Sequence, residues 1–145
     1  MDRVERAVSC FKEGFTCSQA MLSTYGPQLG LNHELALKVS GAFGGGMARM
    51  GETCGAVTGA FMVIGLKHGN ARVEDKQAKE RAYSLVKEFV DRFKSRNGSI
   101  VCRELLGYDI STPEGMKLIK EKKLTTTLCP KFVQDAAEII EQILE

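Results

Sequence analysis

The chain has 145 residues, 43% of them hydrophobic and 26% charged, which is typical of a globular protein and not of a disordered chain. Lys and Arg number 20 and Asp and Glu 18, which gives a net charge of +2. So small an excess does not build the basic stripe that is expected of a nucleic-acid-binding domain. The longest uncharged apolar run, residues 55–66, is too short for a membrane span, and the charged N-terminus does not resemble a secretory signal. We expect one cytoplasmic domain over residues 1–145, with no nucleic-acid or membrane partner.

Helical periodicity dominates the chain, and no long segment alternates between apolar and polar residues as a strand would. Apolar residues recur every three or four positions in several segments, and one of these follows a capping residue, Asn32. The periodic segments, in chain order, are residues 4–11, 35–43, 78–93 and 132–144. Asn97-Gly98 is a typical helix end. We predict an all-α fold, a compact bundle of about seven helices joined by short turns.

A further segment, residues 54–67, is predicted to be the central helix of this bundle. Between residues 55 and 66 it is apolar on every side, and a helix without a polar face is buried by its neighbours. Gly55 and Gly59, together with Ala56 and Ala60, would let neighbouring backbones approach closely.

Five cysteines occur, and four of them fall where a helix is expected to begin. Cys17 follows Thr16, Cys54 opens the central helix, Cys102 comes shortly after a predicted Ser99 cap, and Cys129 is expected to be a cap itself because Pro130 follows. A helix N-terminus stabilises negative charge and lowers the pKa of a thiol. These positions therefore favour redox or metal chemistry over inert packing. Cys10 lies inside the first helix, and we assign it to packing.

Cysteine spacing does not choose among the chemistries that remain. The chain has no Cys-x-x-Cys motif, which excludes a local thioredoxin-like pair, and the spacings match neither zinc fingers nor ferredoxins. A helical bundle can still gather distant residues, so a Cys₄ metal or iron–sulfur site remains an alternative, with Cys17, Cys54, Cys102 and Cys129 as its ligands. Two disulfides are equally compatible with four cysteines, and three pairings are open.

A glycine run, Gly44-Gly45-Gly46, precedes Cys54. The sequence from Gly46 to Thr53 matches a phosphate-binding loop except that Glu52 replaces its lysine, so we reject nucleotide hydrolysis. The glycine run can still bind an anion or a small substrate next to the thiol, or simply pack tightly against a crowded centre.

The segment from Gly44 to Ala60, which contains Thr53-Cys54-Gly55-Ala56, resembles the signature of the C_GCAxxG_C_C family of redox-active proteins. Three further segments agree with it: Phe15-Thr16-Cys17-Ser18-Gln19-Ala20, the stretch from Ser99 to Gly107 around Cys102, and Leu128-Cys129-Pro130-Lys131-Phe132-Val133. The resemblance covers nearly the whole chain and its four cysteines, but the small residues around Cys54 stand in a different register from the family shorthand. Selenocysteine in similar members implies thiol redox chemistry.

We therefore predict a thiol redox protein, with a thiol–disulfide oxidoreductase as its enzyme class. Cys54 is the predicted attacking thiol and Cys17 its partner, with Cys102 and Cys129 as a second pair. The alternatives are the metal or iron–sulfur protein and a non-catalytic helical interaction module. Thiol exchange itself requires no cofactor. The redox partner or small-molecule substrate is not identified by the sequence, and neither is the oligomeric state, for which a homo-oligomer is one option.

Overall fold

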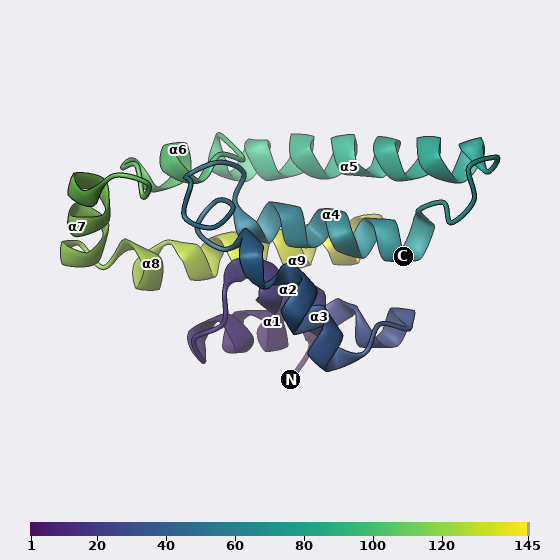
Figure 1. The fold of residues 1–145 in the computed structure, drawn as a ribbon, viewed down its shortest axis with the longest axis horizontal. Helices are drawn as coiled ribbons and strands as arrows, with labels where there is room; N and C mark the ends of the chain where they lie inside the picture. The colour runs from purple at the N-terminus through teal and green to yellow at the C-terminus, as the bar shows by residue number, and fades with distance from the viewer. Residues whose placement is uncertain (145) are drawn as a thin grey trace.

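The computed structural model describes residues 1–144, which form nine α-helices and two short 3-10 turns (Figure 1). The α-helices are α1 (Arg3–Lys12), α2 (Cys17–Tyr25), α3 (His33–Ser40), α4 (Gly55–His68), α5 (Lys76–Asn97), α6 (Cys102–Leu106), α7 (Pro113–Glu121), α8 (Leu124–Thr127) and α9 (Cys129–Ile143). The 3-10 turns are η1 (Pro27–Leu29) and η2 (Gly41–Phe43). The predicted all-α fold is confirmed. The predicted count of about seven is close, because α6 and α8 have only five and four residues.

Short polar side chains begin most of the longer helices. Asp2, Thr16, Asn32, Asp75 and Thr112 each accept a hydrogen bond from a backbone N–H in the first turn of α1, α2, α3, α5 and α7. At α2 the cap is reciprocal, because the Gln19 side chain accepts from the Thr16 N–H in return. Gly98, with a φ of 84°, ends α5 in the left-handed conformation, as the sequence predicts.

The apolar helix α4 packs against α2, α5 and α9 (Figure 1). α5 runs antiparallel to it and α9 runs alongside it in the same direction, so α4 and α9 begin at the same end of the molecule. The first half of α4 is buried on all sides, as predicted. Burial on every side does not extend to its last turn, where Leu66 is 40% exposed and Lys67 is exposed as well.

Two glycines of α4 bring α2 into close contact, as the sequence predicts. A Cβ atom on Gly59 would lie 2.7 Å from the Met21 Cβ, and one on Gly55 would lie 3.0 Å from the Ser18 backbone nitrogen. Real Cβ atoms essentially never approach another atom as closely as 2.7 Å, so the packing requires glycine at position 59, and at position 55 a side chain would make an unusually tight contact. The glycines therefore fix where α2 lies relative to the start of α4.

A row of aromatic rings joins α4, α5 and α9. Phe61 meets Phe89 edge-on with 6.2 Å between ring centroids, Phe89 stacks on Phe93 at 5.9 Å, and Phe93 contacts Phe132. Phe89 and Phe93 are completely buried.

In the described part of the chain, no helix combines the length and apolarity needed to cross a membrane.

Candidate functional site

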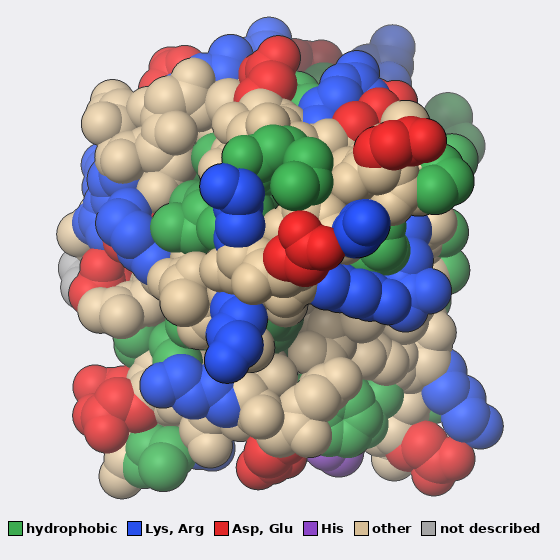
Figure 2. All heavy atoms as spheres, turned by 90° about the vertical axis from the view of Figure 1, so that its left-hand side faces the viewer, with side chains coloured by type: hydrophobic (Ala, Val, Ile, Leu, Met, Phe, Trp, Pro, Cys, Tyr) green, Lys and Arg blue, Asp and Glu red, His purple; other side chains and the backbone are tan. Residues whose placement is uncertain are grey.

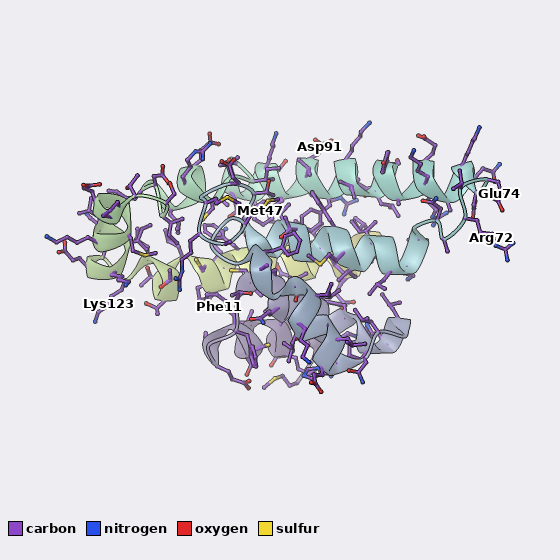
Figure 3. All side chains as sticks on the ribbon, in the orientation of Figure 1. Phe11, Met47, Arg72, Glu74, Asp91 and Lys123 are labelled. Carbon is purple, nitrogen blue, oxygen red and sulfur yellow. The ribbon has the colours of Figure 1, made fainter. Side chains whose placement is uncertain are left out.

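A cavity of about 700 Å³ opens where the helix starts meet, and all four cysteines singled out from the sequence line it. We call it the cysteine cavity. Cys54 and Cys102 are buried, being 5% and 8% exposed, whereas Cys17 and Cys129 are partly exposed. In Figure 3, Phe11 from α1 and Met47 from the glycine loop lie at this end of the molecule. Folding thus brings together four thiols that are far apart in the sequence.

Each of the four cysteines lies at a helix start, although the exact positions differ from the predicted ones. Cys54 is itself the N-cap of α4. The other three are the first residues of α2, α6 and α9. Cys129 therefore is not a cap, since that position belongs to Leu128. The cap before Cys102 is Val101 and not Ser99, whose hydroxyl accepts a hydrogen bond from the Val101 N–H.

The contact between α2 and α4 places Cys17 beside Cys54. A Cβ on Gly55, directly after Cys54, would lie 3.2 Å from the Cys17 Cβ. Because Gly55 has no side chain, the start of α2 packs directly against the start of α4. Because both helices begin at this point, their unpaired N–H groups lie in one neighbourhood.

A short backbone pairing places Cys102 near Cys54. Thr53 and Val101 form an isolated antiparallel bridge. On either side of it, the Cys54 N–H donates to the Ile100 carbonyl at 2.8 Å and the Cys102 N–H to the Glu52 carbonyl at 2.6 Å. These bonds tie the chain before α4 to the chain before α6, and so hold both cysteines at the cavity wall.

The pKa of Cys54 lies below its ordinary value, although burial alone would raise it. The main cause is its interaction with the thiol of Cys17, and the backbone N–H groups of Ala56 and Val57 in the first turn of α4 add to it. The pKa of Cys17 is well above its ordinary value because of the thiols of Cys129 and Cys54 and because of burial. The thiol of Cys17 is therefore harder to ionise than the thiol of Cys54.

The pKa of Cys102, like that of Cys17, lies above its ordinary value. Burial, together with the negative charges that Cys54, Cys129 and Asp109 can carry nearby, raises the pKa of Cys102 to about 12. The prediction that a helix start lowers the pKa of each of the four thiols is therefore wrong for both Cys17 and Cys102. At both positions burial and the neighbouring thiols outweigh the effect of the helix start.

The glycine loop between η2 and α4 contains an unusual left-handed turn. Five consecutive residues, 45–49, have φ between 51° and 69°, and three of them (Met47, Ala48 and Arg49) are not glycine. Such residues cost about 1–2 kcal/mol each in this conformation. The turn is closed by hydrogen bonds from Arg49 N to the Gly44 carbonyl (3.0 Å) and from Glu52 N to the Gly46 carbonyl (2.9 Å).

Gly44, Gly45 and Gly46 all line the cysteine cavity, and two of them are also required by close packing. A Cβ on Gly44 would lie 2.4 Å from the Thr16 Cγ2, and one on Gly46 would lie 2.6 Å from the Cys102 Cβ. The predicted tight packing is therefore observed, whereas the binding of an anion or substrate by this segment stays a prediction. Glu52, which replaces the lysine of a phosphate-binding loop, pairs with Arg103 at 3.1 Å.

Among residues 1–144, no group of three or more His, Cys, Asp or Glu side chains is placed so that it could hold a metal ion. The four-cysteine metal alternative therefore gains no support from the arrangement of side chains, and all five cysteines are free thiols. Cys10 is not part of the cavity lining. Its thiol lies 3.6 Å from the Ser23 hydroxyl between α1 and α2, in agreement with its assignment to packing.

The cavity also contains residues that the sequence analysis did not identify. Lys12 and Arg49 line it together with an apolar wall. Neither residue belongs to a motif: Lys12 ends an ordinary amphipathic helix, and Arg49 lies in the left-handed turn. Only the packing of α1 against α2 and α9 brings Lys12 to this site.

Fold and site together define an all-α protein that gathers four thiols from four helix starts around one cavity. A family model described as "Putative redox-active protein (C_GCAxxG_C_C)" matches residues 15–143, so the chain belongs to that family. The matched span includes the four cysteines of the cavity and leaves out Cys10. No curated protein and no solved structure matches the chain.

Proposed function

We propose that the protein is a thiol–disulfide oxidoreductase that works in a reducing, cytoplasmic environment, with Cys54 as its attacking thiol. One observation carries the proposal: Cys54 lines an open cavity with three other thiols, and its pKa is lowered where burial alone would raise it. A thiolate is the nucleophile in disulfide exchange, so the thiol that ionises first reacts first. The family's description as redox-active agrees with this chemistry.

The exchange proceeds in two steps. The Cys54 thiolate attacks one sulfur of an oxidised partner, R–S–S–R, so that a mixed disulfide forms and RS⁻ leaves. Cys17 then gives its proton to the departing thiolate and attacks the Cys54 sulfur, which releases the second RS⁻ and leaves a Cys17–Cys54 disulfide. The partner gains two electrons and the protein loses two. The raised pKa of Cys17 suits this order, because Cys17 stays protonated until the mixed disulfide has formed.

Cys129 and Cys102 have different parts in this proposal. The thiol of Cys129 is the neighbour that affects Cys17 most, so it can take over the disulfide from Cys54 by a second exchange. Cys102 interacts electrostatically with both Cys54 and Cys129 but stays protonated at neutral pH, which makes it the slowest of the four to react. Attack of Cys102 on the Cys129 sulfur then releases the Cys17 thiol and leaves the disulfide on the second pair, Cys102 and Cys129.

Alkylation of the native, reduced protein near neutral pH tests the first step. We expect iodoacetamide to modify Cys54 faster than a free model thiol, as measured by peptide mass spectrometry. Replacing Cys54 by Ser should abolish reduction of a disulfide substrate, whereas Cys17→Ser should stop the reaction at a mixed disulfide on Cys54 that is visible as added mass. Cys10→Ser is the matched control and should react like the wild type, because Cys10 lies outside the cavity.

Two results would contradict the proposal. If none of the four cavity cysteines reacts faster than the model thiol, the chain is better described as a non-catalytic helical module. If Cys54→Ser and Cys10→Ser reduce the substrate equally well, Cys54 is not the attacking thiol.

A further inference from the structure

Apart from the thiols, the ionisable side chains that line the cysteine cavity are all basic. Lys12, at the end of α1, and Arg49, in the left-handed turn, contribute the charged side chains among the described residues that line it. No Asp or Glu side chain within residues 1–144 lines it. In Figure 2, which views the molecule from the α7–α8 end, Lys and Arg side chains border a hollow in the surface.

Neither of these cations is neutralised by a neighbour. Among the described residues, Lys12 and Arg49 form no ion pair within 4.0 Å, whereas other basic residues such as Arg92, Arg96 and Arg103 do. Both side chains are exposed and can move toward a ligand. Gly45, Gly46 and Ala48 also line the cavity, and their N–H groups donate no backbone hydrogen bond.

The rest of the wall is largely apolar. Its large apolar side chains are Phe11, Phe15, Leu105, Leu106, Ile110 and Phe132. A cavity of about 700 Å³ lies within the range of about 300–1,000 Å³ that is usual for small-molecule sites. Such a site takes a compact molecule with an apolar body and an anionic group.

We infer that the substrate of this site is a small organic disulfide with a carboxylate and an apolar or aromatic body. The inference rests on the proposed function and names its substrate class. The carboxylate lies against Lys12 and Arg49 while the body contacts the apolar wall, which places the disulfide next to Cys54. The step is the exchange described above: the substrate is reduced to two thiols, and the reduced protein supplies both electrons as it forms one disulfide.

A single-turnover experiment with three disulfides tests the charge requirement. The pre-reduced protein is mixed with dithiobis(nitrobenzoate), which is anionic and aromatic, with dithiodipyridine, which is neutral and aromatic, and with cystamine, which is cationic. Each rate constant is divided by that of mercaptoethanol with the same disulfide, to remove intrinsic reactivity. We expect the corrected rate to be about tenfold higher for the anionic disulfide than for the neutral one, and lowest for cystamine. High salt should reduce the difference.

Variants of the two cations locate the effect. Lys12→Met and Arg49→Met should each lower the preference for the anionic disulfide about threefold, and Lys12→Glu should lower it further. Arg72→Met is the matched control, because it removes one positive charge at the opposite end of the molecule (Figure 3). It should leave the preference unchanged.

The outcomes separate this inference from the proposed function. Equal corrected rates for the three disulfides, or equal effects of Lys12→Met and Arg72→Met, would overturn the substrate class while leaving thiol exchange intact. If none of the disulfides is reduced at all, the proposed function itself fails.

Discussion

Cys54 and Cys102 line the same cavity, yet their surroundings move their pKa values in opposite directions. Cys54 caps a helix of 14 residues and accepts stabilisation from its first N–H groups and from Cys17. Cys102 begins a helix of five residues, is buried, and faces other groups that become negative. The neighbouring Cys17 thiol and the first N–H groups of α4 favour the Cys54 thiolate, whereas burial and neighbouring charges keep Cys102 protonated.

The raised pKa of Cys102 predicts a loss of stability at alkaline pH. In the unfolded chain the thiol ionises near its ordinary pKa of 9.0, whereas in the folded protein it stays protonated up to about 12. The unfolded state therefore loses a proton first, and stability falls as the pH rises above 9. By about pH 10 this effect amounts to about 1.4 kcal/mol.

Urea unfolding under reducing conditions at pH 7 and pH 10 measures the effect. Between the two pH values, the free energy of unfolding should fall by about 1.4 kcal/mol less in Cys102→Ala than in the wild type. Leu105 lines the same cavity and does not titrate, so Leu105→Ala is the control. This variant should be less stable than the wild type at both pH values, and its stability should depend on pH as in the wild type. An identical pH dependence in Cys102→Ala and the wild type would show that Cys102 does not titrate as described.

Among the elements, the pair α2 and α4 determines the site, because their contact places Cys17 beside Cys54. Gly59 lies where this contact is closest, with Met21 and Ser18 opposite. Gly65 lies further along the same helix, and a Cβ added there would have no atom within 4 Å. The two glycines therefore offer a comparison within one helix.

We expect Gly59→Ala to lower the free energy of unfolding by about 1–3 kcal/mol through overpacking. Gly65→Ala should raise it by about 0.5–1 kcal/mol, since alanine is the better helix former. Gly59→Ala should also slow alkylation of Cys54 near neutral pH, because moving α2 away removes the main cause of its lowered pKa. Equal stability changes in the two variants would mean that the contact does not constrain α2.

The sequence predicts the elements of this fold better than the site they form. Periodicity and caps such as Asn32 locate the long helices, because helix formation depends on residues three and four positions apart. The glycines at 55 and 59 predict close packing correctly, because the absence of a side chain lets another backbone approach whichever segment is the neighbour. The sequence does not reveal that Lys12 reaches the cavity, nor that Cys102 is protonated. Both depend on which distant segments pack together, and no local pattern carries that information.

At the scale of the whole molecule, the order of the helices brings the thiols together. α4 and α9 run side by side and begin at one end, while α5 returns the chain to that end before α6 (Figure 1). Cys17 and Cys54 are 37 positions apart in the chain. A disulfide between them would close a long loop in the unfolded state without moving any helix far in the folded one.

Oxidation should therefore stabilise the protein. Closing a loop of this length lowers the entropy of the unfolded chain and is worth up to about 4 kcal/mol. Because folding and disulfide formation are linked, strain that the bond places on the folded cavity reduces this gain and makes the bond easier to reduce. A gain well below 4 kcal/mol would thus indicate an exchangeable bond, whereas the full gain would indicate a structural one. The slope of unfolding against urea should also decrease, since a cross-linked unfolded chain exposes less surface.

Urea unfolding of the oxidised and reduced protein, with the variants Cys17→Ser, Cys54→Ser, Cys129→Ser and Cys10→Ser, identifies the bond. We expect the gain to vanish in Cys17→Ser and Cys54→Ser and to persist in Cys10→Ser, because Cys10 lies outside the cavity. A gain that survives in Cys54→Ser but not in Cys129→Ser would assign the bond to Cys17 and Cys129, the thiol that affects Cys17 most. Equal stability of the oxidised and reduced wild type, with the disulfide verified by mass, would mean that strain in the folded cavity cancels the whole entropic gain.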